Sequence, residues 1–104
     1  MSIKRRENMA LTRTDEKAVR STIWKDFGYV IKMMSGDKKV PVFVTDATLQ
    51  EFAAPPVSPE ELPERLRQYR RQIEEIASGK HSAGQIANIE NYEIVCVASV
   101  DVRA

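Results

Sequence analysis

Cysteine and histidine, the residues that most often build reactive or metal-binding sites, are nearly absent from this sequence. The 104 residues include one cysteine, Cys96, and one histidine, His81. A lone cysteine excludes a disulfide bond within the chain, and a metal site of several thiolates needs partners that the sequence lacks. We therefore expect no catalytic residues, no metal ion and no cofactor.

Long hydrophobic runs are missing as well. No stretch approaches the roughly 18 apolar residues that indicate a membrane-spanning helix. The N-terminal segment is basic, but no apolar run follows it, so it does not have the pattern of a secretory signal. Together with the single cysteine, these absences predict a cytoplasmic protein.

The sequence also lacks an excess of either charge. Sixteen basic and fifteen acidic residues leave a net charge of +1. A dedicated DNA-binding domain usually has a clear basic excess, so this balance argues against one. The hydrophobic share of 42% and the charged share of 30% are typical of a folded globular protein with one modest core.

The N-terminal residues 1–13 are polar and basic and show no hydrophobic periodicity. This pattern predicts a flexible arm, followed by a single domain over residues 14–104. The candidate nucleic-acid contacts of the arm are Lys4, Arg5, Arg6 and Arg13.

The segment 15–27 is compatible with two structures. Val19, Ile23 and Phe27 recur every four residues, which predicts one face of a helix. A threonine that can cap the start and a glycine that can end the helix support this assignment. Against it, the β-branched Val19, Thr22 and Ile23 prefer strands. We favour a helix over 15–27 and keep a strand as the alternative.

A β-hairpin is the clearest prediction. Two β-prone runs flank the turn-forming cluster at 35–38, which contains a glycine able to take positive φ. We expect strands near 29–34 and 39–45. Pro41 cannot donate a backbone hydrogen bond, so its strand either lies at an edge or turns that nitrogen outward.

Two helices and a closing strand are expected after the hairpin. A short helix over 46–53 begins at a cap-like threonine or aspartate, and a long helix runs from near Pro63 to about Gly79. Residues 80–90 show no periodicity and are expected to be irregular. The alternation that follows predicts a strand over 92–98.

The long helix has one apolar side, with spacings of four and three residues that suit docking on a sheet or pairing with a second helix. The residues of this side are Leu62, Leu66, Tyr69, Ile73 and Ile76.

The arginines of the same helix alternate with glutamates on its other side. The (i, i+4) pairs are Glu61–Arg65, Arg70–Glu74 and Arg71–Glu75. Each such pair stabilises a helix by about 0.2–0.5 kcal/mol and largely cancels the positive field that a phosphate backbone would meet. We interpret this side as a solvent-exposed, charge-balanced surface.

Reactive side chains are few. We place His81 in an exposed loop beside Ser82, where adjacent side chains cannot form a catalytic triad. Cys96 lies among valines and isoleucine in the closing strand, so we expect it to pack as a small hydrophobic residue with an unreactive thiol.

Aromatic and methionine side chains offer the best candidate contact surface. Met33 and Met34 are adjacent, so a strand directs one to the core and the other outward. Trp24 and Tyr29 are expected in the core; if exposed, they form the partner-contact candidates together with Met34.

Three segments, VIKMMSGDKKVPVFVTDATL, RLRQYRRQIEEIASGKHSAG and YEIVCVASVDV, follow one another over residues 30–102. In this order of features the chain resembles a small bacterial family, domain-of-unknown-function family 1488. The resemblance implies a small α+β fold with no established activity, so it assigns no catalytic residue to this chain.

The sequence as a whole predicts an α+β fold. We expect a small antiparallel sheet, formed by the hairpin and the C-terminal strand, with one long helix covering one face. Such a sheet leaves edges free, so we expect a non-catalytic interaction domain that acts through a protein partner or a homodimer. The alternatives are nucleic-acid binding by the basic arm and an enzyme that uses His81 or Cys96.

Overall fold

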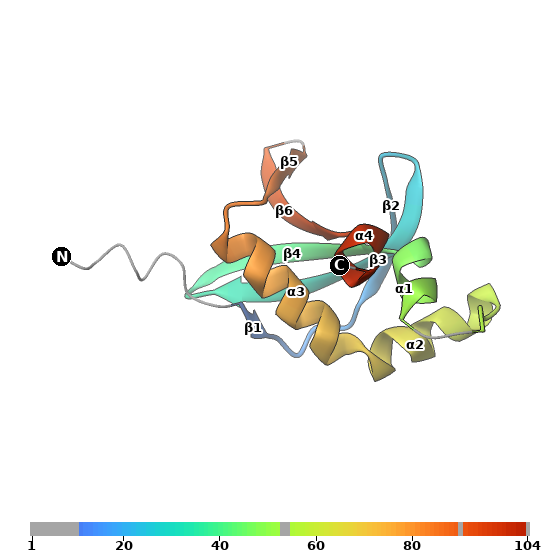
Figure 1. The fold of residues 1–104 in the computed structure, drawn as a ribbon. Helices are drawn as coiled ribbons and strands as arrows, with labels where there is room; N and C mark the ends of the chain where they lie inside the picture. Colours follow the sequence, from blue (N-terminus) through green and yellow to red (C-terminus); the bar gives the residue numbers. More distant parts are fainter. Residues whose placement is uncertain (1–10, 53–54, 90, 104) are drawn as a thin grey trace.

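The computed structural model describes residues 11–52, 55–89 and 91–103. Within these ranges the chain forms an α+β fold, in which helices cover one face of a six-stranded sheet (Figure 1). The predicted fold class is therefore confirmed. None of the helices in these ranges has the length and hydropathy of a membrane span.

The elements follow one another along the chain in a mixed order. The strands are β1 (Thr12–Arg13), β2 (Val19–Ile23), β3 (Asp26–Ser35), β4 (Lys38–Thr45), β5 (Ala87–Ile89) and β6 (Tyr92–Val97). The helices are α1 (Asp46–Glu51), α2 (Leu62–Gln68), α3 (Arg70–Ser82) and α4 (Ser99–Arg103), with a 3-10 turn, η2 (Pro59–Glu61), before α2.

The sheet is mixed and not antiparallel throughout, which corrects the prediction. Its order is β1-β3-β4-β6-β5, and β2 also pairs with β3. β4 and β6 are parallel, with Val42 opposite Val95, whereas the other pairs are antiparallel. The reason is the connection: α3 carries the chain back along the sheet, so β6 starts at the same end as β4.

The predicted hairpin is confirmed as β3 and β4. The two strands pair from Gly28 opposite Thr45 to Ser35 opposite Lys38, and Gly36 in the turn has φ of 65°. Pro41 lies in a central strand, but just before the residues of β4 that pair with β6. The ladder to β6 therefore needs no hydrogen bond from its nitrogen.

The helix favoured for 15–27 is wrong. Residues Val19–Ile23 form β2, and β3 already begins at Asp26. The spacing of apolar residues did not mark a buried face, because Val19 is 54% exposed and Phe27 60% exposed. The segment forms the strand that its β-branched residues favour, which was the alternative prediction.

Most of the predicted N-terminal arm, residues 1–10, lies outside the described residues. The boundary of the arm at residue 13 needs correction, because Leu11 is buried and β1 pairs with β3. The backbone N–H of Leu11 donates to Ser78 Oγ at 2.9 Å. This contact ties the start of the described chain to α3.

The short predicted helix is confirmed as α1. Thr45 caps it, and its Oγ1 accepts a hydrogen bond from the backbone N–H of Thr48 at 3.1 Å. The hydroxyl of Thr48 donates to the carbonyl of Val97 at 3.0 Å, which joins α1 to the end of β6.

The predicted long helix is divided at Tyr69 into α2 and α3. Its apolar side does dock on the sheet: Leu62, Leu66 and Ile73 are buried, and Tyr69 stacks on Phe52 with ring centroids 5.1 Å apart. The end predicted at Gly79 is wrong, because α3 continues to Ser82.

The region predicted to be irregular, 80–90, instead holds the last turn of α3 and the short strand β5. The closing strand is confirmed as β6, and α4 follows it without having been predicted. Three-residue strands and single-turn helices carry too little periodicity to be seen in sequence.

The core lies between the sheet and the helices α2 and α3 and is almost entirely aliphatic. Its buried members are Leu11, Ile31, Met33, Val40, Val42, Val44, Leu49, Leu62, Leu66, Ile73, Ala77, Val95 and Val97. Phe43 is buried on the other face of the sheet, where its ring packs against Gly28.

Candidate functional site

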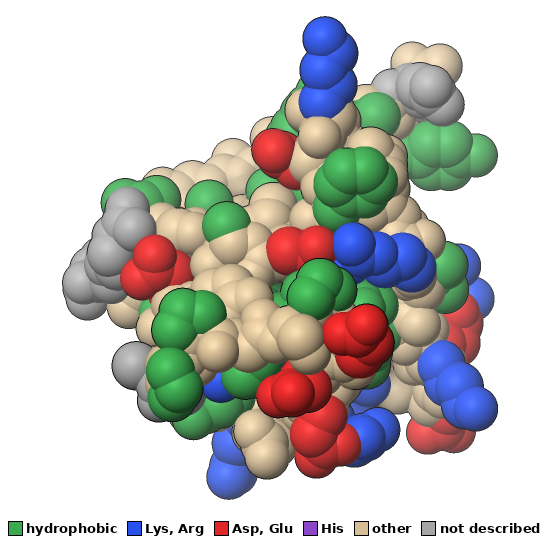
Figure 2. Space-filling view, turned by 90° about the vertical axis from the view of Figure 1, so that its right-hand side faces the viewer, with side chains coloured by type: hydrophobic (Ala, Val, Ile, Leu, Met, Phe, Trp, Pro, Cys, Tyr) green, Lys and Arg blue, Asp and Glu red, His purple; other side chains and the backbone are tan. Residues whose placement is uncertain are grey.

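The hairpin of β2 and β3, hereafter the outer hairpin, carries most of the exposed large hydrophobic side chains. Trp24 and Phe27 are each 60% exposed and Val19 is 54% exposed. Figure 2 views the molecule from the side of this hairpin and shows hydrophobic side chains lying among charged ones. Val19 and Phe27 lie on opposite faces of the hairpin, and Trp24 lies at its tip. Since large exposed hydrophobic side chains indicate contact surfaces, this hairpin is the candidate site.

The turn of the outer hairpin has an unfavourable backbone. Trp24 and Lys25, its two central residues, have φ of 52° and 69°. Two positive φ values are the pattern of a type I′ turn, which natural hairpins usually build from Asn-Gly. Each bulky residue with a positive φ lowers the stability of the fold by roughly 1 kcal/mol or more, and such strain concentrates at functional sites.

The body of this hairpin is held firmly by Arg20. Its Nη1 and Nη2 donate to the two carboxylate oxygens of Asp46 at 2.6 and 2.8 Å. These hydrogen bonds raise the pKa of Arg20 above its ordinary value. The guanidinium also lies over the rings of Phe27 and Tyr29, 5.6 and 5.0 Å from their centroids. The hairpin is therefore fixed to α1 at its base and strained at its tip.

β2 has a free edge. It pairs with β3 on one side and with no other strand in the part of the chain that the structure describes. Because the turn has two residues, Ile23 and Asp26 form the closing hydrogen-bonded pair, and such pairs alternate along the hairpin. Arg20 and Thr22 consequently direct their N–H and C=O groups away from β3.

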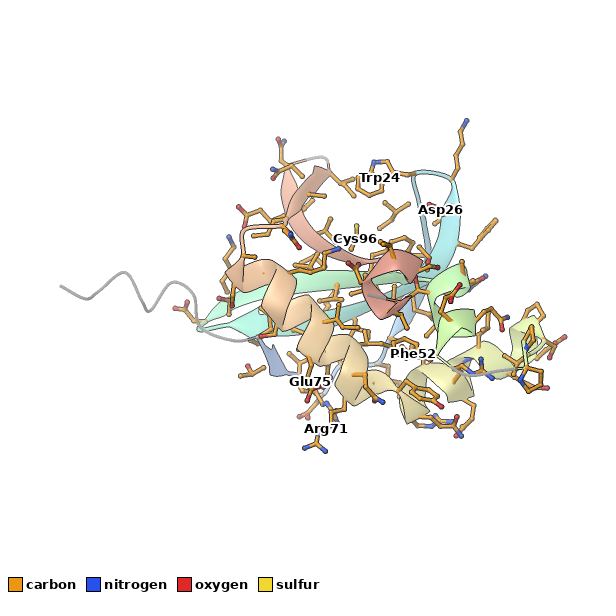
Figure 3. The ribbon with its side chains drawn as sticks, viewed as in Figure 1. Trp24, Asp26, Phe52, Arg71, Glu75 and Cys96 are labelled. Carbon is orange, nitrogen blue, oxygen red and sulfur yellow. The ribbon has the colours of Figure 1, made fainter. Side chains whose placement is uncertain are left out.

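A shallow pocket of about 470 Å³ lies beneath the tip of the outer hairpin. Trp24 forms one side, and the other sides come from residues 84–87, Cys96 and the Lys80–Asp101 pair. Figure 3 shows the ring of Trp24 on the side of the hairpin that faces β5 and β6. In the view of Figure 1, the outer hairpin and the β5–β6 pair both rise above β4, the hairpin on the right and the pair on the left.

The thiol of Cys96 is not activated in this pocket. Burial raises the pKa of Cys96, and the nearby positive charge of Lys80 only partly offsets this effect. A thiol with a raised pKa is protonated at neutral pH and is a poor nucleophile.

Lys80 and Asp101 serve the fold of the C-terminus. Lys80 Nζ donates to the carbonyl of Cys96 at 2.7 Å and to Asp101 Oδ2 at 2.8 Å, and the backbone N–H of Ala98 donates to the same carboxylate oxygen at 2.8 Å. Burial raises the pKa of Asp101, but these hydrogen bonds outweigh it and leave the pKa below its ordinary value. The pair therefore holds α4 against β6 as a fixed ion pair.

His81 lies in the last turn of α3 and not in an exposed loop, which corrects the prediction. It is half-buried, and its Nδ1 has no hydrogen-bond partner among the described residues. No group of three or more His, Cys, Asp or Glu side chains in those residues is placed to hold a metal ion.

The arginine-rich side of the long helix is only partly as predicted. Arg70 pairs with Glu74 at 2.9 Å, as expected. Arg71 and Glu75 point away from the sheet into solvent (Figure 3), but no ion pair joins them in the described chain. Arg65 is buried and donates to the carbonyl of Leu49 at 3.4 Å, so its assignment to the exposed side is wrong.

The three predicted partner-contact residues are not brought together. Trp24 is at the tip of the outer hairpin, so the expectation of a core position is wrong for it. Tyr29 is half-buried and packs against the core. Met34 lies near the other end of β3, opposite Thr12 and Lys39, and Met33 is the buried member of the methionine pair.

The predicted nucleic-acid contacts are also separated by the structure. Lys4, Arg5 and Arg6 lie outside the described residues. Arg13 is bound to Glu74 through two hydrogen bonds of 2.8 Å, whose strength raises the pKa of the arginine. Val19 and Phe27 were missed as contact candidates, because together with Ile23 they recur every four residues, which suggested a buried helix face.

Comparison of the chain with protein-family models, with curated proteins and with solved structures found no match.

Proposed function

We propose that the protein is a non-catalytic interaction module that acts as a homodimer, in which the free edges of two β2 strands pair. The observation that carries this proposal is the outer hairpin, where β2 has no second strand partner among the described residues and where Val19, Trp24 and Phe27 are exposed. Free strand edges are places where another chain can add a strand, and apolar flanks strengthen such pairing.

The sequence of β2 suits pairing with itself. Two antiparallel copies centred on Ser21 place Arg20 of each copy opposite Thr22 of the other. The backbone groups of these two residues are those that face outward, so this register forms about four hydrogen bonds across the dimer axis. A register centred on Arg20 would instead bring two arginines opposite each other, which is unfavourable.

The same register also places apolar side chains of the two copies opposite each other. Val19 of one copy lies opposite Ile23 of the other, on the face of the sheet that carries Gly28. Because the axis is two-fold, this contact occurs twice, and the sheet continues from one subunit to the other. The self-complementary pattern favours a second copy over an unrelated partner.

The interface is small, so the association is expected to be weak. A five-residue strand with a few exposed side chains buries less than the roughly 1,200 Å² of a stable interface. We expect a dissociation constant on the order of 10 µM.

We also propose that the chain belongs to family 1488, which its sequence resembles. This membership assigns no activity to the chain.

Analytical ultracentrifugation tests the proposal. The wild-type protein should change from monomer to dimer between about 1 and 200 µM. Val19→Ser should weaken the dimer about tenfold, because two valine side chains lose their apolar contact. The matched control is Val100→Ser, which removes an equally large exposed side chain from α4 and should leave the association unchanged.

A wild-type protein that remains strictly monomeric over this range would refute the homodimer. Equal loss of association in Val19→Ser and Val100→Ser would place the contact elsewhere and would also refute the role of the outer hairpin.

A further inference from the structure

A second pocket, of about 440 Å³, lies between the β1–β2 connection and α2 and α3. It is separate from the free edge of β2 and from the pocket under Trp24. Its charged lining consists of three cations, Lys17, Arg67 and Arg70, and no aspartate or glutamate of the described residues lines it. The volume is in the range of sites that hold small ligands.

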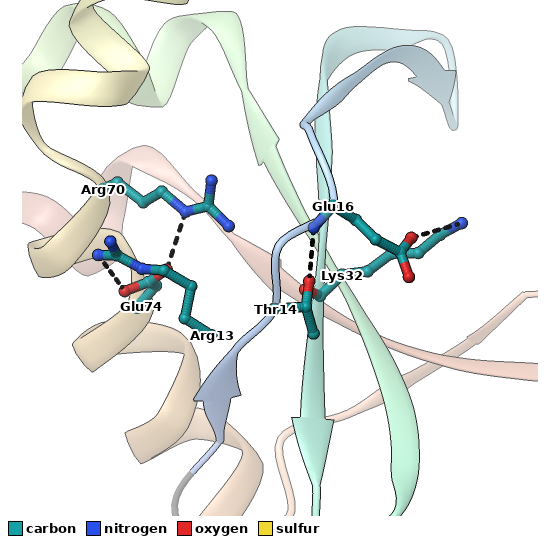
Figure 4. Close-up of polar contacts among 6 residues, drawn as sticks. All are labelled: Arg13, Thr14, Glu16, Lys32, Arg70 and Glu74. Atoms are coloured by element: carbon teal, nitrogen blue, oxygen red, sulfur yellow. Dashed lines mark hydrogen bonds and ion pairs between the residues drawn. The ribbon is translucent and has the colours of Figure 1, made fainter.

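Arg70 is the most informative member of this lining. Its Nε donates to Glu74 Oε2 at 2.9 Å, which fixes the guanidinium, and the side chain is 20% exposed. Nη2 is buried and has no hydrogen-bond partner among the described residues. Figure 4 shows the terminal nitrogens pointing away from Glu74, toward the β1–β2 connection. An unpaired buried guanidinium N–H is costly, so an oxyanion acceptor that comes within reach of the Arg70 guanidinium, which lines the pocket, would be favourable.

The other two cations complete the positive lining. Arg67 is paired with Glu64 at the surface, and Lys17 has no ion-pair partner among the described residues. Since Glu74 is shared between Arg13 and Arg70, positive charge exceeds negative charge around the pocket.

The chain segment that carries Lys17 is held in place. The hydroxyl of Thr14 donates to the carbonyl of Lys32 at 2.7 Å and accepts the N–H of Glu16 at 3.2 Å. The carboxylate of Glu16 pairs with Lys32 and Lys39 on the neighbouring strands (Figure 4 shows the Lys32 contact). Because these contacts already order the segment, binding a ligand there has a smaller entropic cost.

The remaining wall of the pocket is apolar. It is formed by the half-buried ring of Tyr29 and by Pro63 and Leu66 from α2. A ligand that fits such a site has a negative end for the guanidinium and ammonium groups and an apolar or aromatic body for the ring and aliphatic side chains.

We propose that this pocket binds a small organic oxyanion, a carboxylate or phosphate group joined to an apolar or aromatic body. Arg70 is the central contact and donates to the oxyanion through its terminal nitrogens. Arg67 and Lys17 add positive charge at the rim, and the ring of Tyr29 packs against the body of the ligand. The site is independent of the proposed dimer.

The test is a titration followed by amide chemical shifts in two-dimensional NMR, with benzoate and phenyl phosphate as probes. Probes of this size are expected to bind with a dissociation constant of about 1 mM and to shift the amides near Lys17, Tyr29 and Leu66. Benzyl alcohol, which lacks the charge, and inorganic phosphate, which lacks the body, should each bind at least about fivefold more weakly. Tighter binding of phenyl phosphate assigns a phosphate ligand, and tighter binding of benzoate assigns a carboxylate.

Substitutions locate the contact. Arg70→Gln should weaken binding about tenfold and Lys17→Gln about threefold, because a charge-assisted hydrogen bond is stronger than an exposed charge. The matched control is Arg71→Gln, which removes the same charge from the adjacent position on α3 but outside the pocket and should change binding less than twofold. If Arg70→Gln does not fold, the exposed pair Lys17→Gln/Arg67→Gln should weaken binding about tenfold instead.

Three results would overturn the proposal. They are the absence of saturable shifts with both anionic probes up to about 10 mM, equal binding of benzyl alcohol, and a loss in Arg71→Gln as large as that in the pocket variants.

Discussion

Two hairpins share the strand β3, and their turns are built in opposite ways. The central hairpin, β3–β4, turns through Gly36 and Asp37, and the residue with positive φ is the glycine. The outer hairpin, β2–β3, turns through Trp24 and Lys25, which both have positive φ without being glycine. The central turn has the residue that its geometry favours, and the outer turn does not.

The surroundings of the two hairpins also differ: those of the central hairpin are favourable, and those of the outer hairpin are not. The central hairpin is packed on one face by the aliphatic core and continues into β6, so its strands have partners on both sides. The outer hairpin exposes large side chains and a free edge. Turn strain and exposed apolar surface therefore occur together, in the region for which we propose self-association, and both are costs that a partner can offset.

The largest effect is expected at Gly28, where the outer hairpin crosses the ring of Phe43. A Cβ at this position would lie 2.9 Å from Phe43 Cε1 and would overlap the backbone of β4. Gly28→Ala should therefore destabilise the protein by about 3 kcal/mol or more, measured by chemical denaturation.

The matched control for Gly28→Ala is Gly79→Ala. The space around a Cβ at Gly79 is open, and the residue lies inside α3. This variant should stabilise the protein by about 0.5–1 kcal/mol. Equal effects of the two substitutions would show that the close contact under the outer hairpin does not exist in solution.

The contrast between the turns predicts that removing glycine from the central turn lowers the stability of the protein, whereas introducing glycine into the outer turn raises it. Gly36→Ala should destabilise the protein by about 1–2 kcal/mol, because alanine is unfavourable at positive φ. Trp24→Asn/Lys25→Gly gives the outer turn its preferred residues and should stabilise the monomer by about 1–2 kcal/mol. If thermal and chemical denaturation show that this double variant is destabilised, the outer turn is not strained.

A pH effect is expected at Glu74, which joins β1 to α3 away from the outer hairpin. Burial raises the pKa of this residue, but hydrogen bonds and charges from Arg13 and Arg70 outweigh it, so the folded pKa is lower than the unfolded one. The stabilisation is thus present above the unfolded pKa and is lost as pH falls through the folded pKa.

Denaturation of wild type and Glu74→Gln at pH values from about 7 to 3 measures this effect. The variant should be less stable by on the order of 1 kcal/mol at neutral pH, with the difference shrinking in acid. Glu75→Gln is the control, because Glu75 is exposed on the same helix and no ion pair joins it to Arg71 within the described residues. An unchanged difference at all pH values would contradict the assigned role of Glu74.

The smallest effect on stability is expected from Thr22→Pro. The N–H of Thr22 faces away from β3, so its loss should destabilise the monomer by less than about 1 kcal/mol. The same change removes donors from the proposed dimer contact and should abolish association, whereas Thr22→Ala keeps the N–H and should retain it. Ultracentrifugation distinguishes the two variants, and a dimeric Thr22→Pro would contradict edge pairing through β2.

The central hairpin, α1 and β6 were predictable because their local signals agree with their final environment. A glycine-containing turn, a threonine cap and alternating apolar residues each specify a structure without reference to distant contacts. The outer hairpin was not predictable in this way. Its turn residues are not those that a turn of this type prefers. Its exposed valine and phenylalanine have the spacing that is expected of a buried helix face.

The candidate sites were less accessible from the sequence than the fold. Trp24 was named as a possible contact and is exposed, but its neighbours there depend on β2 being a strand. The anionic-ligand pocket joins Lys17 to Arg67 and Arg70 across about fifty residues of sequence, and only the packing of α2 against the β1–β2 connection brings them together. The parallel pairing of β4 with β6 is equally a long-range result.

Amide hydrogen exchange of the wild-type protein at several concentrations tests the central claim most directly. The amides of Arg20 and Thr22 should exchange rapidly at about 1 µM and become protected as the concentration rises past about 10 µM. The amide of Ser21, which faces β3, should be protected throughout and serves as the internal reference. Exchange of Arg20 and Thr22 at one rate, whatever the concentration, would contradict the pairing of β2 with a second copy.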